Sequence, residues 1–231
     1  MIYKREDHPE LYEKVIKDFN DYILNTVSKP NPVFSGMPPC PFAKAEWLKN
    51  KVDIVICDLV ELIYEAEDGG DDIEEVLELM NEFNVEFNNK QTKSTLILVD
   101  YNGIQGEKYG VDEGVELAYS LEEFYTEIYP YKVKKDNLDI LCSNPDEVTT
   151  WGNLPPYFSI LVQNSELLAK AIKVLSKAGY YKNLKKGDIV EGIADDPVYK
   201  GIKFADGEGE GTDIKGTHIM EDNDLYDELN K

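Results

Sequence analysis

The stretch "VDIVIC", residues 52–57, is a nearly continuous run of β-branched and apolar residues. Such a run is typical of a strand that is covered on both faces, as in a sheet with helices on either side. We therefore expect residues 52–57 to form a central strand. The stretch "STLILVD", residues 94–100, has the same texture and predicts a second buried strand.

Helical patterns flank these two strands. Residues 11–27 carry apolar side chains at helical spacing, which predicts an N-terminal amphipathic helix. The run 58–67 fits either a helix or an extended segment, and the spacing alone leaves this open. Further helical patterns, bounded by capping residues, a proline or a glycine, cover residues 73–83, 120–129 and 168–178.

The segment 101–114 contains four glycines and predicts a mobile loop. After it, Ser120 is followed three residues later by Glu123, which is the pattern of a capping box. We therefore expect the next helix to begin at Ser120 and to end at Pro130, since proline cannot continue a helix.

Two more strands are predicted at "LDILCS" (138–143) and "YFSILVQ" (157–163). Their connection has no helical pattern, so these two strands can pair in antiparallel fashion. The other strands alternate with helices, which favours parallel pairing through crossover connections. The sequence thus predicts an α/β fold, a layered mixed sheet of about four strands with helices packed on it.

The texture of the chain changes near residue 188. Glycine and acidic residues crowd stretches such as "DGEGEGTD" (206–213), and apolar residues become isolated. Such a segment buries too little apolar surface to order itself. We expect one α/β domain over residues 1–187 and an acidic, flexible C-terminal tail over residues 188–231.

The formal net charge of −22 restricts the classes of partner. Nucleic acids and anionic membrane surfaces would be repelled, whereas a basic protein would be attracted. No stretch approaches the ~20 apolar residues of a membrane span, and the N-terminus lacks an apolar signal core. We expect a soluble, cytoplasmic protein with no nucleic acid or membrane partner.

The three cysteines are an odd number at wide spacing, without a metal-type pair. This pattern is typical of a reducing compartment and predicts no disulfide framework, no metal site and no cofactor. Acid clusters such as Asp68, Asp71 and Asp72 do not follow the spacing of an EF-hand, so we interpret them as solvated surface.

Cys40 is the best candidate for chemistry. Pro41 suits the first position of a helix and disfavours helical geometry at the residue before it, which places Cys40 at the N-cap. Backbone N–H groups and Lys44, one turn on, would then lower the thiol pKa. The helix end contributes about 0.3 to 1 kcal/mol and the lysine less than ~1 kcal/mol, against the ~2 kcal/mol that half-ionisation at neutral pH requires.

Activation of Cys40 would therefore need another group, usually a histidine. The two histidines, His8 and His218, lie near the two ends of the chain, away from the predicted strand ends. Glu46 opposes ionisation of the thiol. We do not expect a Cys–His pair, and we interpret Cys57 and Cys142 as structural residues within strands.

The segments "CPFA" (40–43), before the first long strand, and "LPPY" (154–157), before the last strand and helix, carry a family resemblance. Over residues 10–182 the chain resembles an uncharacterised bacterial and phage domain family of unknown function. The resemblance implies that Cys40 and Tyr157 face a common pocket. The predicted pocket residues are Cys40, Pro41, Phe42, Lys44, Pro156 and Tyr157. Many relatives have a His-Pro step after the third strand, where this chain has Asn144 and Pro145.

Two functions are compatible with these observations. The sequence favours a non-catalytic binding protein whose acidic surface engages a basic protein partner, because activation of the thiol falls short and no base accompanies it. The alternative is a small thiol-dependent enzyme or redox domain that uses Cys40 at a helix N-terminus. Whether the protein is an enzyme is left open, and the sequence makes no prediction of oligomeric state.

Overall fold

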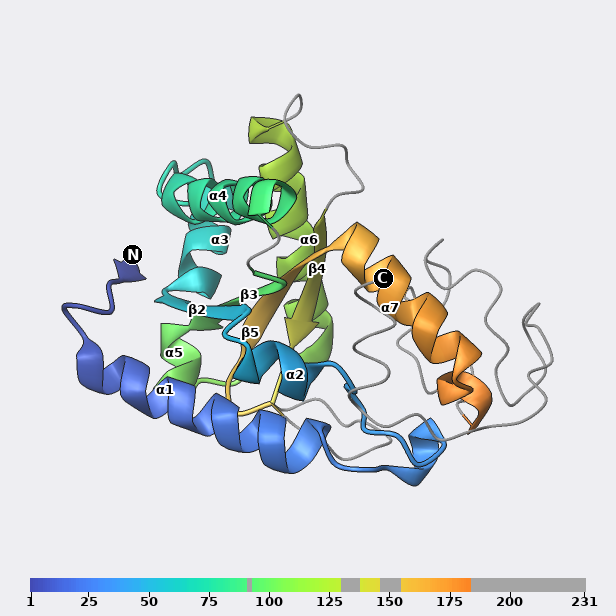
Figure 1. The fold of residues 1–231 in the computed structure, drawn as a ribbon. Coiled ribbons are helices and arrows are strands. Elements are labelled where there is room, and N and C mark those ends of the chain that lie inside the picture. Colours follow the sequence, from blue (N-terminus) through green and yellow to red (C-terminus); the bar gives the residue numbers. More distant parts are fainter. Residues whose placement is uncertain (91–92, 130–137, 146–154, 184–231) are drawn as a thin grey trace. The chain divides into compact units, whose positions relative to one another are not determined.

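The computed structural model describes residues 1–90, 93–129, 138–145 and 155–183 (Figure 1). The chain divides into two compact units, which we describe separately. The first comprises residues 1–22, 49–148 and 154–165, and the second comprises residues 23–48, 149–153 and 166–231. The predicted tail, residues 188–231, lies outside the described residues, and the domain boundary near residue 187 stays a prediction.

The first unit contains a five-stranded mixed sheet of order β1-β2-β3-β5-β4. Strands β2 and β3 are parallel, whereas β5 is antiparallel to both β3 and β4. The α/β class and the antiparallel pairing of the last two strands are confirmed. The strands are β1 (Ile2–Tyr3), β2 (Val52–Cys57), β3 (Thr95–Asp100), β4 (Leu138–Ser143) and β5 (Ser159–Asn164).

The predicted central position of residues 52–57 is wrong. The central strand is β3, in which all six residues are buried, whereas only Ile56 and Cys57 are buried in β2. The outer neighbour of β2 is β1, which pairs only with those same two residues. A continuous apolar run indicates burial on two faces but does not tell how many strands lie beyond it, and the two residues of β1 are too few for a pattern.

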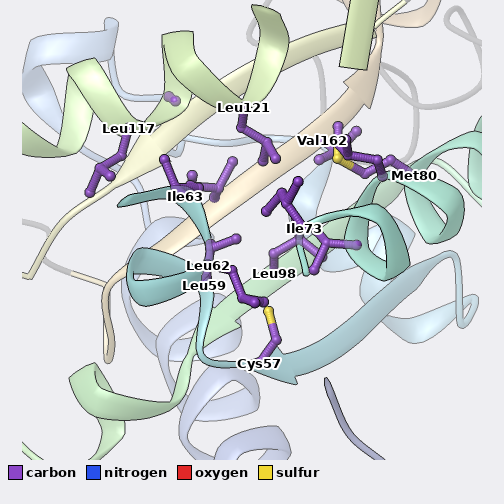
Figure 2. Packing of buried hydrophobic residues seen from close by; sticks show 14 of the residues in the cluster. Cys57, Leu59, Leu62, Ile63, Ile73, Met80, Leu98, Leu117, Leu121 and Val162 are labelled. Carbon is purple, nitrogen blue, oxygen red and sulfur yellow. The ribbon is translucent and has the colours of Figure 1, made fainter. Parts of the chain in front are cut away.

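Helices cover both faces of this sheet (Figure 1). On one face, α3 (Leu59–Glu67), α4 (Glu74–Lys90) and α6 (Val111–Ile128) contribute to one core with β2, β3 and β5. Figure 2 shows Leu59, Ile63, Met80 and Leu121 converging on Leu98 and Val162. On the other face lies α1 (Pro9–Tyr22), whose buried residues are Tyr12, Val15 and Phe19. The N-terminal amphipathic helix is confirmed, and it continues into the π-helical turn η1 (Ile23–Val27).

The predicted loop and the predicted helix start at Ser120 are both corrected. A short helix, α5 (Tyr101–Ile104), follows β3, and α6 begins at Val111, so Ser120 lies inside it. The cap is at Gly110, whose backbone N–H donates to the Glu113 carboxylate at 3.0 Å. Since the N-cap residue has no polar side chain, the usual sequence signal of a helix start is missing there.

Gly114 lets α6 approach the sheet closely. A Cβ at this position would lie 2.6 Å from Cys142 Sγ and 3.1 Å from Phe158 Cε2. Helix α6 can therefore pack on β4 and β5 only because this residue has no side chain.

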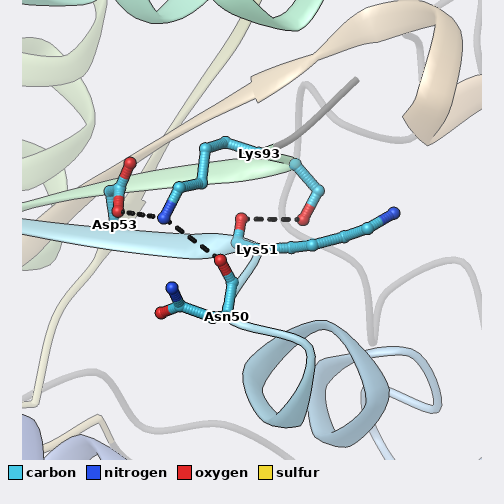
Figure 3. A network of polar contacts seen from close by, with 5 residues as sticks. Asn50, Lys51, Asp53 and Lys93 are labelled. Atoms are coloured by element: carbon cyan, nitrogen blue, oxygen red, sulfur yellow. Dashed lines mark hydrogen bonds and ion pairs between the residues drawn. The ribbon is translucent and has the colours of Figure 1, made fainter. Parts of the chain in front are cut away.

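Polar contacts tie the first residues of β2 and β3 together (Figure 3). Lys93 Nζ donates to Asp53 Oδ1 at 2.6 Å and to the Asn50 carbonyl at 3.1 Å. The Ser94 hydroxyl donates to the Lys51 carbonyl at 3.2 Å.

The second unit is built from short segments around one long helix. It contains η2 (Pro32–Phe34), α2 (Ala43–Leu48), most of α7 (Ser165–Lys177) and η3 (Tyr180–Asn183). The end of α7 before Gly179 agrees with the sequence, and Gly179 adopts a φ of 78°. Its core contains Phe34, Met37, Phe42, Ala171, Ile172, Leu175, Tyr180 and Tyr181.

Candidate functional site

Cys40 lies in the second unit, three residues before the start of α2. The Ala43 N–H donates to the Cys40 carbonyl at 3.2 Å, and the residue is exposed to solvent. Helix α2 itself begins at Ala43, two residues after the predicted first position at Pro41. Cys40 is therefore not the N-cap that the sequence analysis expects, because Pro41 and Phe42 form a turn before the helix.

The electrostatics at Cys40 nevertheless oppose ionisation. Desolvation by the atoms around the sulfur raises the thiol pKa, and the Glu46 carboxylate raises it further. The amide donors of Phe42 and Ala43 lower the pKa but do not compensate. Although the residue as a whole reaches solvent, which weakens the desolvation, its strongest charged neighbour is an acid. The thiol is thus protonated at neutral pH.

The other predicted pocket residues of the second unit do not surround the thiol with functional groups. Pro41 and Phe42 are buried, and Phe42 belongs to the hydrophobic core of that unit. Lys44 is exposed. Phe42 has a packing role, and the described contacts assign no ligand-binding role to Lys44.

Tyr157 and Pro156 precede β5, in the first unit. Tyr157 is buried, and its hydroxyl donates to the Asp18 carboxylate on α1. Burial and the Asp18 contact raise the Tyr157 pKa. This contact fastens α1 to the start of β5. Because Cys40 and Tyr157 belong to different units, their common pocket stays a prediction.

A small open cavity of about 400 Å³ lies in the second unit. The Ser35 hydroxyl donates to the Gly179 carbonyl at 3.0 Å, and the Asn183 amide donates to the Pro32 carbonyl at 3.3 Å. These polar side chains already have partners, so they are poorly suited to orient a ligand. The lining residues are Pro32, Ser35, Gly36, Met37, Ala178, Lys182 and Asn183.

The carboxyl end of β3 holds a buried acid that the sequence analysis missed. Asp100 has no exposed surface. One carboxylate oxygen accepts from Val60 N at 3.2 Å, and the other accepts from Gly103 N and the Tyr109 hydroxyl, both at 2.8 Å. Burial raises the Asp100 pKa although these donors oppose the shift. Since the carboxylate is sealed from solvent, its role is to join α3, α5 and the Tyr109 segment.

His8 is not as remote from the strand ends as its sequence position suggests. Strand β1 brings the ring of His8 to 5.2 Å from that of Tyr3. The Tyr3 ring stacks on Tyr101, directly after β3, at 4.2 Å, and its hydroxyl donates to Asp58, directly after β2, at 3.0 Å. The prediction that His8 lies away from the strand ends is therefore wrong. These contacts hold the N-terminal segment on the sheet.

The most distinctive surface of the first unit is the solvent-facing side of α3, α4 and α6, which we call the acidic layer. Residues 58–89 contain twelve acidic residues and no Lys or Arg, and residues 109–128 contain six and none. These two stretches carry a combined formal charge of −18, and residues 188–231 carry a further −9. The exposed acids of these stretches are Glu61, Glu65, Glu67, Asp68, Asp71, Asp72, Glu74, Glu75, Glu78, Glu82, Asp112, Glu116, Glu123 and Glu127.

On α6 the exposed acids form a stripe around an aromatic residue. Asp112, Glu116, Glu123 and Glu127 follow one another at helical spacing, and Tyr119 lies in the middle of the stripe. Tyr119 is 62% exposed, so its ring is available for contact with a partner. The stripe extends over roughly 22 Å, at 1.5 Å per residue.

Contacts between the helices make the acidic layer continuous. The Tyr64 hydroxyl donates to Glu113 at 2.7 Å, and the Ser120 hydroxyl donates to Glu67 at 2.5 Å, which joins α3 to α6. The bond to Glu113, with burial and nearby acids, raises the Tyr64 pKa to about 12.

The acids of α4 act on the far end of α6. Burial raises the Tyr129 pKa, and the charges of Glu78, Glu74 and Glu82 add to the shift. A rise in the pKa of a tyrosine beside these acids reflects the negative potential that they create. The potential of the layer therefore extends over all three helices.

Exposed hydrophobic residues are concentrated on the same helices. Among the described residues, seven large hydrophobic side chains are exposed, and five of them lie on α3, α4 or α6. Acidic and apolar groups together are typical of a surface that contacts a protein. The five are Tyr64, Val85, Val111, Tyr119 and Ile128.

Comparison of the chain with protein-family models, with curated proteins and with solved structures found no match. The family resemblance of the "CPFA" and "LPPY" segments stays a prediction. Within the described ranges, no helix has the length and apolar character needed to cross a membrane. The same residues contain no group of three or more His, Cys, Asp or Glu placed to hold a metal ion.

Proposed function

We propose that this chain is a non-catalytic binding protein that engages a basic protein partner through the acidic layer of α3, α4 and α6. The observation that carries the proposal is the segregation of charge. Two stretches with a combined formal charge of −18, residues 58–89 and 109–128, lie on helices that the fold places on one face of one sheet.

This arrangement costs stability, which argues that it serves recognition. Like charges four residues apart on a helix destabilise it by about 0.2 to 0.5 kcal/mol per pair. The acidic layer contains such pairs on all three helices, for a total of roughly 1 to 2 kcal/mol. Solubility alone would not require acids without any interspersed lysine or arginine. The pairs are Glu61–Glu65, Glu74–Glu78, Glu78–Glu82, Asp112–Glu116 and Glu123–Glu127.

The mixture of groups on the layer favours a protein as the partner. Tyr64 and Tyr119 offer exposed rings among the acids. Aromatic rings bind lysine and arginine side chains through their faces, and they are enriched at interfaces between proteins. Nucleic acids and anionic lipids would be repelled by the same carboxylates.

The proposal can be tested with a defined probe, a fluorescent amphipathic helical peptide that carries lysine and arginine on one face. The test variant is E116K/E123K/E127K, on α6. Its matched control is E10K/E13K/D21K, on α1, which changes three exposed acids and the net charge by the same amount. Binding is measured by fluorescence anisotropy at an ionic strength of about 0.15 M, where exposed charges more than ~8 Å apart are largely screened.

We expect the α6 variant to bind the peptide at least about tenfold more weakly, equivalent to ~1.4 kcal/mol, while the α1 variant binds nearly as well as the native chain. Y119A should also weaken binding, although it leaves the charge unchanged. Equal losses in the α6 and α1 variants would mean that the peptide responds only to net charge, and the proposal would be rejected.

A thiol-dependent enzyme remains the second proposal, on the observation that Cys40 is exposed three residues before α2 and that the backbone N–H groups of Phe42 and Ala43 act to lower its thiol pKa. The raised thiol pKa makes this function less well supported than binding. Alkylation of Cys40 as a function of pH tests it, and an apparent pKa well below the ordinary value of 9.0 would favour the enzyme.

A further inference from the structure

Helix α7, in the second unit, has the opposite character to the acidic layer. Its exposed lysines Lys170, Lys173 and Lys177 follow one another at intervals of three and four residues, so they share one face. Residues 167–183 contain no Asp or Glu. The opposite side of α7 buries Ala171, Ile172 and Leu175 in the core of the second unit. We call the three exposed lysines the lysine face.

The lysine face and the stripe on α6 have the same spacing. Lys170, Lys173 and Lys177 stand at positions i, i+3 and i+7 of α7. Glu116, Tyr119 and Glu123 stand at positions i, i+3 and i+7 of α6. In both helices the outer two residues are separated by roughly 10 Å along the axis.

Two helices packed side by side could therefore align a cation with each carboxylate and the middle lysine with the tyrosine ring. Lysine–carboxylate pairs and a cation over an aromatic face are both attractive, by about 0.5 to 1 kcal/mol each at exposed sites. Opposite charge and equal spacing together make the stripe on α6 a suitable contact for the lysine face.

We propose that the lysine face of α7 is a docking surface for the acidic layer of a second copy of this chain. This inference rests on the proposed function, because it names the chain itself as one basic partner of the layer. The two contact surfaces are different patches, so the association is head-to-tail, and it generates rings or open chains of copies according to the rotation between them.

The net charge of −22 on each copy does not prevent this contact at physiological ionic strength. The screening length there is about 8 Å, so distant acids contribute little repulsion, while groups in contact interact directly. The association depends on concentration by mass action and weakens at high salt.

Charge exchange tests the proposal in the full chain. One variant, K170E/K177E, reverses the lysine face, and another, E116K/E123K, reverses the stripe on α6. A control variant, K4E/K17E, reverses two exposed lysines of the first unit and has the same net charge as the lysine-face variant. Sedimentation velocity over a roughly hundredfold range of protein concentration reports the association. Circular dichroism confirms that each variant folds.

We expect the native chain and the K4E/K17E control to associate with rising concentration, and each of the two face variants to stay monomeric alone. An equimolar mixture of the two face variants should associate again, because the native lysine face of one variant meets the native stripe of the other, and glutamates on α7 meet lysines on α6. A native chain that stays monomeric over the whole range overturns the proposal, as does a mixture that fails to associate.

The peptide experiment separates this inference from the proposed function. If the native chain is monomeric but the layer binds the cationic peptide with the expected preference over the α1 control, the inference fails and the function stands. If the peptide also binds the α6 variant and the α1 control equally well, both proposals are rejected.

Discussion

The two faces of the sheet in the first unit are covered by helices of different electrostatic design. On one face, α1 alternates acids and lysines, with Glu10 four residues before Lys14 and Glu13 four residues before Lys17. On the other face, α3 and α6 carry acids and no Lys or Arg, and α4 carries only acids until its last residue, Lys90. Both faces bury apolar residues on the sheet, and this burial does not depend on which charges the helices expose to solvent.

This contrast separates charge that supports the fold from charge that does not. Opposite charges four residues apart stabilise α1, and Asp18 also receives a hydrogen bond from Tyr157. The exposed acids of the layer repel one another instead. Substitutions on the two faces therefore have different expected effects, and the following experiments measure them.

The largest effect is expected at Asp100, a buried acid at the end of β3. D100A leaves Val60 N and Gly103 N without this acceptor and leaves the Tyr109 hydroxyl with Glu107 alone, and it should lower the free energy of unfolding by about 3 kcal/mol. E116A, at an exposed acid on α6, should change it by less than about 0.5 kcal/mol. Urea unfolding measures both, and equal effects would contradict the assignment of Asp100 as a structural residue.

Asp100 should also leave a signature in the pH dependence of stability. Its pKa is raised above the ordinary value of 3.8, so the folded chain holds this proton more tightly than the unfolded chain. Its contribution to stability is therefore full below pH 3.8 and decreases as the pH rises towards the raised pKa. Urea unfolding of the native chain and of D100N should be compared between about pH 4 and 7. The unfolding free energy of the native chain should decrease more steeply with rising pH than that of D100N, because D100N has no proton to lose at this position.

The close approach of α6 to the sheet should be the next most sensitive feature. G114A adds a Cβ 2.6 Å from Cys142 Sγ, and we expect a loss of about 1 to 3 kcal/mol in unfolding free energy although alanine favours helices. In a C142A background the same substitution should cost less, because the sulfur is gone. A cost that is the same in both backgrounds would mean that the strain arises elsewhere.

Neutralising exposed acids should change stability in opposite directions on the two faces. E116Q/E123Q/E127Q removes repulsive pairs and should stabilise the chain by about 0.5 kcal/mol at low salt. E10Q/E13Q/D21Q on α1 removes attractive pairs and should destabilise it by a similar amount. Thermal unfolding at low and at high salt measures both, and both differences should shrink at high salt. Shifts of the same sign would show that net charge, not its pairing, controls stability.

The smallest effect is expected at Cys40, which lies on neither face and serves as a reference. C40S should leave stability within about 0.5 kcal/mol of the native value, because the residue is exposed. Iodoacetamide should modify Cys40 with an apparent pKa above 9.0, since desolvation and Glu46 both disfavour the thiolate. Mass spectrometry of the modified peptide assigns the reaction, with C40S as the blank.

The sequence predicts the strongly periodic elements well. Strands β2, β3 and β4 occupy the expected residues, and α1 and α7 lie within a few residues of theirs, because each buries one continuous apolar face. The prediction was wrong where the local signal is short or unusual. Gly110 caps α6 without a polar side chain, and β1 has only two residues.

The candidate sites were only partly predictable. The sequence places Cys40 before a short helix, but the helix begins at Ala43 and not at Pro41 as predicted. The extent to which desolvation and Glu46 raise the pKa of the Cys40 thiol depends on tertiary packing, which cannot be read from the sequence. Asp100 was missed because an acid at the end of a strand looks the same whether it is exposed or sealed.

The sequence by itself determined the α/β class, the helices and strands with strong periodicity, and the absence of cations from residues 58–89 and 109–128, because these are properties of neighbouring residues. Only the tertiary structure decided that these two stretches lie on one face of one sheet, while the lysines of α7 belong to a separate unit. The electrostatic potential at a surface depends on the distances between charges in space. The distance between segments remote in the chain is set by how their apolar faces pack.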